Sequence, residues 1–165
     1  MAWCRLWPLL VLPAGCARAP AAPVAVGDPF PAFELSDLQR QPRRRDDFLG
    51  GPRLINFWAT WCPPCRAEMT GLQVLHRQLQ AQGGGVVAVS VDDDANLVRE
   101  FVLKLGIDYP VLLDPGRALA AGVLRLTAYP TSFLLRADGR VAEVVIGERD
   151  WASPERVAAV LATLR

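Results

Sequence analysis

The chain has 165 residues, 52% of them hydrophobic, and a formal net charge of +1 at pH 7. This length and apolar content are sufficient for one globular domain with its own hydrophobic core. A charge so close to zero gives no electrostatic case for nucleic acid or an anionic membrane surface as a partner. Four cysteines do not suggest a disulfide-rich scaffold.

The first sixteen residues have the composition of an export signal. Arg5 supplies a positive charge, residues 6–12 form a short, mostly apolar run, and small residues follow. Because this run is too short to cross a bilayer as a stable helix, we do not expect a membrane-spanning segment here.

A possible lipid-attachment site closes this signal. Ala14-Gly15-Cys16 resembles a bacterial lipobox, with Pro13 where leucine is usual. The resemblance implies a membrane-anchored lipoprotein with Cys16 as its lipidated N-terminus. The alternative is ordinary cleavage between Ala17 and Ala22, which would give a soluble periplasmic protein.

Residues 17–25 are rich in Pro and Ala and predict a tether that leads into a domain of residues 26–165. Within that domain, residues 39–47 carry four arginines. We expect a solvated turn there. The alternative is a basic loop that meets an acidic partner or lipid headgroups.

The centre of the chain joins an apolar, strand-like run to a helical pattern through two cysteines. Residues 54–58 form the run, and Cys62-Pro63-Pro64-Cys65 follows it. Residues at three- and four-residue steps then predict an inward helix face, made of Glu68, Met69, Leu72, Leu75, His76 and Leu79. A C-x-x-C at a strand-to-helix junction indicates a reversible dithiol/disulfide centre.

This spacing suits thiol–disulfide exchange. Cysteines three residues apart in a first helical turn share a face and can close a small disulfide ring. Cys62 would lie where free backbone N–H groups and the helix dipole favour a thiolate, so we expect it to attack and Cys65 to resolve. We therefore expect Cys62 to be exposed. Pro63 removes a nearby backbone donor, which favours a less acidic thiol, as in a reductant.

Glu68 has two interpretations from the residues alone. It follows Cys65 by three positions on a helix whose other inward positions are apolar, so a buried carboxyl there would have a raised pKa and could exchange a proton with Cys65. The alternative is a solvated glutamate favoured by the helix dipole.

The chain then predicts a second strand and helix. After the glycines of residues 83–85, the continuous apolar run 86–91 predicts a central strand covered on both faces. Three acidic residues follow this strand, Asp92, Asp93 and Asp94. They predict the N-cap and first-turn acids of the next helix rather than a metal site. An apolar stripe is expected on the helix of residues 95–105, formed by Leu97, Val98, Phe101, Val102 and Leu105.

The remaining elements are shorter. Residues 110–114 predict a strand and 117–123 a short helix, before a Tyr129-Pro130 segment. Residues 137–140 predict a turn between two final strands, the second over 141–146. Ser153 is expected to cap a closing helix that runs through Leu164. We expect His76, the only histidine, to be half-buried or on the helix surface.

The segment from Asn56 to Met69 resembles the active site of the TlpA/ResA/CcmG group of extracytoplasmic thioredoxin-like proteins, with both tryptophans, both cysteines and Glu68 in one register. Asn56 stands where cytoplasmic thioredoxin has a buried Asp, and Thr70 stands where the group usually has Pro. The resemblance implies an α/β, thioredoxin-like fold. Its central mixed sheet would be flanked by helices on both faces, with an N-terminal hairpin and an inserted αβ unit.

The resemblance also implies site residues. It favours proton transfer by Glu68 and a cis Tyr129-Pro130 bond beside Cys62, the alternative being an ordinary proline at the start of a strand. An extended substrate segment would pair with backbone groups of that loop. The substrate-binding residues expected are Trp61, Pro63, Tyr129, Pro130 and Thr131.

The sequence therefore predicts an extracytoplasmic, periplasmic protein-disulfide reductase that takes electrons from a membrane thiol–disulfide donor and passes them to oxidised client proteins. The resemblance makes apocytochrome c a candidate client, and a generic reductase fits equally well. We expect no cofactor and no metal, because structural zinc would need further Cys or His ligands near Cys62 and Cys65.

Two other functions compete with this prediction. A copper-binding lipoprotein of the same fold is the main alternative, although such proteins generally use a wider cysteine spacing and a distal histidine. A peroxidase of the peroxiredoxin type would need the pattern P-x-x-x-T-x-x-C, and Ile55 and Ala59 stand at its Pro and Thr positions.

Overall fold

The computed structural model describes residues 23–164. The predicted export signal, the lipidation site Cys16 and most of the predicted tether lie outside these residues. Within them, no helix is long and apolar enough to cross a membrane.

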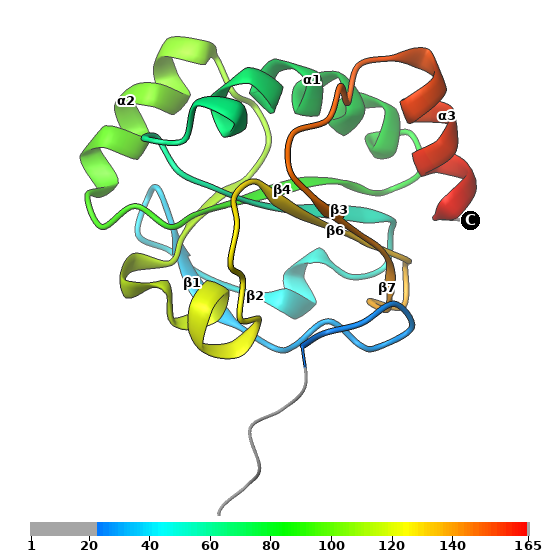
Figure 1. Ribbon diagram of the computed structural model, residues 1–165, viewed down its shortest axis with the longest axis horizontal. Coiled ribbons are helices and arrows are strands. Elements are labelled where there is room, and N and C mark those ends of the chain that lie inside the picture. Colours follow the sequence, from blue (N-terminus) through cyan, green and yellow to red (C-terminus); the bar gives the residue numbers. More distant parts are fainter. Residues whose placement is uncertain (1–22, 165) are drawn as a thin grey trace, which may run out of the picture.

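A mixed β-sheet forms the centre of the domain (Figure 1). In the described residues it has seven strands in the order β2-β1-β5-β4-β3-β6-β7. Strand β3 runs parallel to β4 and β4 parallel to β5, whereas the other neighbours are antiparallel. The strands are β1 (Glu34–Asp37), β2 (Pro42–Arg44), β3 (Arg53–Trp58), β4 (Gly85–Ser90), β5 (Val111–Leu113), β6 (Thr131–Leu135) and β7 (Val141–Ile146).

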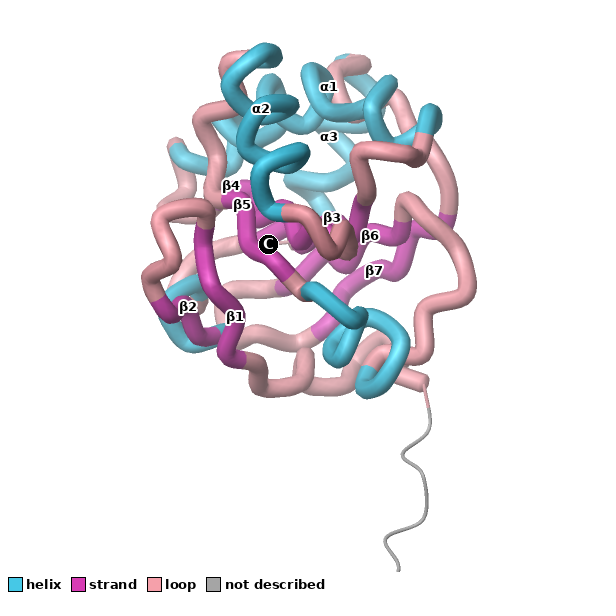
Figure 2. Tube along the Cα trace, turned by 90° about the vertical axis from the view of Figure 1, so that its left-hand side faces the viewer, coloured by secondary structure: helices cyan, strands magenta, loops and turns pink. Residues whose placement is uncertain are grey.

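Helices flank the sheet as predicted, but unequally. The α-helices α1 (Pro63–Gln80), α2 (Ala95–Leu105) and α3 (Pro154–Thr163) lie on one face in both views (Figures 1 and 2). The opposite face carries short turns, namely the 3₁₀ turns η1 (Arg45–Phe48) and η2 (Pro115–Arg117) and the π-helical turn η3 (Ala118–Val123). The predicted thioredoxin-like fold is confirmed, with β1 and β2 as its N-terminal hairpin and α2 and β5 as its inserted unit.

Helix α1 packs its predicted face onto the sheet. Its buried residues are Cys65, Glu68, Met69, Leu72, Leu75, His76 and Leu79, which include all six positions expected from the periodicity. Every residue of β4 is buried, as expected for a strand covered on both faces. Ser153 caps α3 by accepting a hydrogen bond from Arg156 N, so the predicted helix start is also confirmed.

Two glycines allow the starts of β3 and β4 to approach closely. A Cβ at Gly51 would lie 2.2 Å from Gly83 O, and one at Gly84 would lie 2.1 Å from Pro52 O. No side chain fits at these separations. The glycine run after α1 therefore does more than end the helix, because it lets two backbone segments meet.

Two expectations about α2 need correction. Val98 and Val102 are buried, but Leu97 is 52% exposed, because the buried face of the helix is narrower than its apolar stripe. Of the three consecutive aspartates, only Asp94 caps the helix, by accepting from Asn96 N, and α2 has no acid in its first turn. Asp92 is buried and turned away from α2.

His76 is buried, at 6% exposure, rather than half-buried or on the surface. Its Nδ1 accepts a hydrogen bond from Val86 N at 2.9 Å, which links α1 to the start of β4. Burial lowers the pKa of His76, Asp108 opposes this shift, and the positive charges of Arg53 and Arg77 add to it. The imidazole must be neutral at Nδ1 to accept this bond.

This geometry predicts a pH-dependent contribution of His76 to stability. As pH falls through about 6.5, the unfolded chain binds a proton that the folded His76 resists, so the free energy of unfolding should decrease. His76→Gln does not titrate and should lack this decrease. Chemical denaturation of both proteins between pH 7.5 and 5.5 tests it. The stability difference between them, in which shared groups cancel, should change across this range, and parallel curves would contradict the prediction.

Candidate active site

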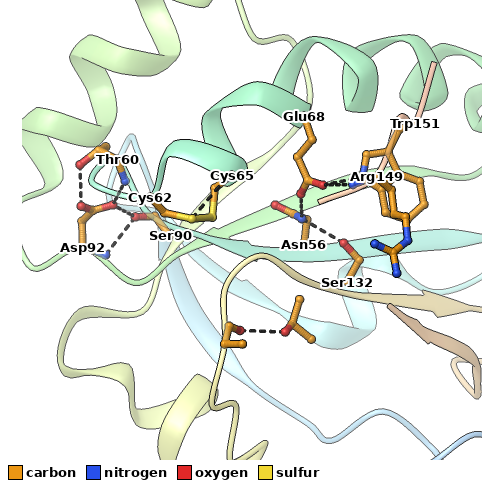
Figure 3. Close-up of a disulfide and its surroundings, with 12 residues drawn as sticks. Asn56, Thr60, Cys62, Cys65, Glu68, Ser90, Asp92, Ser132, Arg149 and Trp151 are labelled. Atoms are coloured by element: carbon orange, nitrogen blue, oxygen red, sulfur yellow. Dashed lines mark hydrogen bonds between the residues drawn. A yellow bond between two sulfur atoms is a disulfide. The ribbon is translucent and has the colours of Figure 1, made fainter. Parts of the chain in front are cut away.

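Cys62 and Cys65 form a disulfide at the start of α1, with their Cα atoms 5.3 Å apart (Figure 3). Cys62 is the N-cap of α1, and its Sγ accepts a hydrogen bond from Cys65 N at 3.3 Å. Pro63 and Pro64 occupy the first helical positions, where a missing N–H costs no helical hydrogen bond. The pair is thus held at the end of the helix that favours a thiolate.

The structure does not place Cys62 in the open position that we expected. Cys62 is only 5% exposed, and Cys65 is fully buried. The reason is the N-cap geometry, because the Cys62 side chain turns back over the first turn of α1 toward Cys65 N. Cys62 nevertheless keeps a small exposed area, whereas Cys65 keeps none.

The carboxyl group of Glu68 is buried, at 3% exposure, and hydrogen-bonded from three directions (Figure 3). Asn56 Nδ2 of β3 donates to Oε1 at 2.7 Å, and Trp151 Nε1 donates to Oε2 at 2.9 Å. Arg149 N also donates to Oε2, at 3.2 Å. Asn56 further donates to Ser132 Oγ on β6, so β3, β6 and the segment before α3 all contribute to this network.

Burial raises the pKa of Glu68, and the charge of Glu148 adds to the shift, whereas the hydrogen bonds from Trp151, Arg149 and Asn56 oppose it. The solvated-glutamate interpretation is therefore wrong. A small polar pocket lies between α1 and residues 148–152, and Glu68 is one of its lining residues. The site thus holds a titratable group one helical turn from Cys65 with a route to solvent.

A second carboxylate, Asp92, holds the segment that precedes Cys62. Thr60 N donates to Oδ2 at 2.9 Å, Thr60 Oγ1 donates to Oδ1 at 2.7 Å, and Ser90 Oγ donates to Oδ2 at 2.7 Å (Figure 3). This role of Asp92 was not predicted from the sequence. Thr60 follows β3 and Asp92 follows its parallel neighbour β4, with Trp58 and Ser90 in register, so both lie at the same edge of the sheet. That adjacency was the available signal.

The Tyr129-Pro130 bond is cis, as expected from the resemblance. The Tyr129 ring meets the Trp61 ring edge-on with centroids 6.2 Å apart, so the proline loop lies against the residue before Cys62. Trp61 is 57% exposed, and Tyr129 is half-buried. Burial raises the pKa of Tyr129, and the charge of Arg117 opposes this shift.

The predicted substrate-binding residues are not equally accessible. Trp61 and Pro63 are exposed and Tyr129 is half-buried, whereas Pro130 and Thr131 are buried. Thr131 Oγ1 donates inward to Ala128 O at 2.8 Å, so its hydroxyl is not free to contact a ligand. In residues 23–164, no three His, Cys, Asp or Glu side chains are grouped so that they could hold a metal ion.

Comparisons with known proteins agree with this geometry. A sequence model of the AhpC/TSA family matches residues 26–144. The chain is 34% identical over 124 residues to thiol-disulfide oxidoreductase ResA of Bacillus anthracis, a match that covers 75% of this chain and 71% of that protein.

Two solved structures are also similar. One is a thiol:disulfide interchange protein of the thioredoxin family from Chlorobium tepidum, with 29% identity, a TM-score of 0.70 and coverage of 88% of this chain and 99% of that chain. The other is a secreted thiol-disulfide isomerase from Corynebacterium glutamicum, with 29% identity, a TM-score of 0.70 and 82% of each chain covered.

Proposed function

This chain belongs to the AhpC/TSA family and is a thiol-disulfide oxidoreductase, and on that premise we propose that it reduces disulfides of client proteins outside the cytoplasm. The observation that carries the proposal is the Cys62–Cys65 disulfide at the start of α1, with Cys62 the only one of the two reached by solvent. It is the oxidised form of a pair that can give two electrons once it has been reduced.

The reaction begins with the reduced pair. The Cys62 thiolate attacks one sulfur of a client disulfide, a Cys62–client mixed disulfide forms, and the other client sulfur leaves as a thiolate. Cys65 then loses its proton and attacks Cys62 Sγ. The Cys62–Cys65 disulfide forms again, and the second client sulfur leaves as a thiolate. The client has gained two electrons and the protein has lost two.

Glu68 is the proposed acceptor of the Cys65 proton. It lies on the same face of α1 three residues after Cys65, and both side chains are buried, so no bulk water lies at the buried thiol to take the proton. Its raised pKa brings the carboxyl closer to the range in which it can both accept a proton and release it. The pocket at residues 148–152 gives that proton a way out to solvent.

The proposed client surface is the strip formed by Trp61 and Tyr129 beside the disulfide. Their edge-on contact joins the C-x-x-C segment to the cis-proline loop, and both rings retain exposed area. An extended client segment would lie along this loop and pair with its backbone. We keep Pro130 as a residue that shapes this surface and exclude the Thr131 hydroxyl from direct contact.

The reduced state must be restored by a donor, for which we propose a membrane protein with its own thiol pair. Apocytochrome c, whose haem-attachment cysteines must be reduced, remains the proposed client that the family resemblance suggests. We place the reaction outside the cytoplasm because residues 1–16 have the pattern of an export signal, and we propose a tether over residues 17–25 and an anchor at Cys16.

Variants of the two cysteines test the exchange itself. Cys62→Ser should abolish reduction of insulin in the presence of dithiothreitol beyond the uncatalysed rate, because no attacking thiolate remains. Reduced Cys65→Ser should instead accumulate a mixed disulfide with insulin, visible on a non-reducing gel and by mass spectrometry. The double variant Cys62→Ser/Cys65→Ser serves as the control. A stable adduct on Cys65 in the Cys62→Ser protein would reverse the proposed order.

The role of Glu68 predicts a specific pH dependence. In the wild type, the rate of mixed-disulfide resolution should rise with pH as Glu68 ionises, at a pH above the usual glutamate pKa because burial raises it. Glu68→Gln should lose this step and be slower at pH 7 by about tenfold or more. Ser132→Ala disturbs the same hydrogen-bond network without removing the carboxyl and should keep the step. An unchanged profile in Glu68→Gln would exclude the carboxyl from proton transfer.

The proposed anchor predicts the chemistry of the mature N-terminus. When the full chain is produced in a bacterium that processes lipoproteins, mass spectrometry should find a chain that begins at a lipid-bearing Cys16. Cys16→Ser should move the protein from the membrane fraction to the soluble fraction. An unmodified mature chain that begins beyond residue 16 would rule out the anchor and leave export intact.

A further inference from the structure

A single arginine lies against the aromatic strip beside the disulfide. The guanidinium carbon of Arg117 lies 6.0 Å from the centre of the Trp61 ring, within reach of a cation–π contact. Trp61 in turn contacts Tyr129. Side chains from the C-x-x-C segment, the η2 turn and the cis-proline loop therefore meet at one place on the surface.

The backbone under Arg117 is held firmly in an uncommon conformation. Arg117 has φ +60°, in the left-handed region that side chains other than glycine rarely adopt. Its N–H donates to Asp114 O at 2.9 Å, and Gly116 N donates to Asp93 Oδ1 at 2.9 Å. The buried carboxylate of Asp114 also accepts from Leu119 N and Ala120 N, which fixes the start of η3. These bonds fix the backbone from which the Arg117 side chain extends toward Trp61.

The charge of Arg117 is available to a ligand. Its side chain is exposed, and among the ion pairs of the described residues none includes Arg117. The carboxylates of Asp93 and Asp114 accept backbone hydrogen bonds from Gly116 and Leu119, and neither forms an ion pair with Arg117. Arg66, one residue after Cys65, is also exposed and absent from those ion pairs. The surface beside the disulfide thus combines the positive charges of Arg117 and Arg66 with the aromatic rings of Trp61 and Tyr129.

We propose that Arg117 is a specificity-determining residue, which selects client segments that carry a carboxylate next to the disulfide cysteine under attack. An extended segment on the Trp61–Tyr129 strip would bring such a carboxylate to the free guanidinium, where the opposite charges attract. A basic residue at the same client position would meet a like charge. This inference rests on the proposed exchange at Cys62 and adds to it a preference among clients.

Synthetic peptides test the preference directly. Three peptides, each with one internal disulfide, differ only in the residue next to the first cysteine, which is Asp, Asn or Lys. The pre-reduced full-length protein is mixed with each peptide, and acid-quenched samples are analysed by mass spectrometry for the rate of reduction. Each rate is divided by that peptide's rate with dithiothreitol, which removes differences in intrinsic reactivity.

The wild type should reduce the Asp peptide about two- to fivefold faster than the Lys peptide at low salt, and the ratio should shrink as salt screens the charges. Arg117→Gln should bring the Asp:Lys ratio close to one, and Arg117→Lys should retain a clear preference for Asp. Arg125→Gln is the matched control, because Arg125 is exposed, has a similar left-handed backbone (φ +56°) and lies in the same connection between β5 and β6. It should keep the wild-type ratio.

The outcomes separate this inference from the function on which it rests. Equal rates for the three peptides in the wild type, or an unchanged ratio in Arg117→Gln, would overturn the selection by Arg117 and leave the exchange at Cys62 intact. Loss of the ratio in Arg117→Lys as complete as in Arg117→Gln would show that charge is not the determinant and would also overturn it. Failure of the wild type to reduce any of the peptides would count against the proposed function itself.

Discussion

The pairing of strand β3 on both of its sides brings the functional groups together. On one side β3 runs parallel to β4, and on the other it runs antiparallel to β6. The first pairing puts Thr60 and Asp92 at the same edge of the sheet, where the chain turns into α1 and Cys62. The second sets Asn56 opposite Ser132, two residues after Pro130. A slip of one residue in either register would turn Asn56 away from Glu68.

Two buried carboxyl groups flank the disulfide, and their surroundings give them different tasks. Asp92 accepts hydrogen bonds from Thr60 and Ser90 at the end of a strand, and this fixes the backbone that leads to Cys62. Glu68 is also hydrogen-bonded, but burial dominates and raises its pKa. The first group holds backbone geometry, and the proton-transfer role that we propose belongs to the second. Neither task can be assigned from the residue type alone, since Asp and Glu differ here in environment more than in chemistry.

Much of this arrangement could be predicted because its signals are local. The inward face of α1, the Ser153 cap and the β7 strand follow from periodicity and capping residues, and the cis Tyr129-Pro130 bond came with the family resemblance. The errors arose where a distant part of the chain decides the outcome. Leu97 is exposed because the packing of α2 buries only part of its apolar stripe. His76 is buried because the start of β4 covers it and supplies a hydrogen bond.

The partial burial of Cys62 and the position of Arg117 have a related cause. The burial of Cys62 depends on how its side chain folds over the first turn of its own helix. The contact of Arg117 with Trp61 depends on a turn that lies some fifty residues further along the chain. No pattern of apolar and polar residues contains that information. Only the assembled sheet brings η2 next to the loop that precedes α1.

The match to the AhpC/TSA sequence model ends at residue 144, whereas the hydrogen-bond network of Glu68 includes residues beyond it. Two of its three hydrogen-bond donors, Arg149 N and Trp151 Nε1, belong to the connection between β7 and α3. A chain that kept the Cys-Pro-Pro-Cys segment but lacked Trp at position 151 would have the same two cysteines. The pKa of its Glu68 would differ, because the hydrogen bond from the indole would be missing. With Glu68 in the proposed role, the rate of thiol–disulfide exchange in such proteins would depend on a segment that carries no redox group, while the Cys-Pro-Pro-Cys signature stays the same.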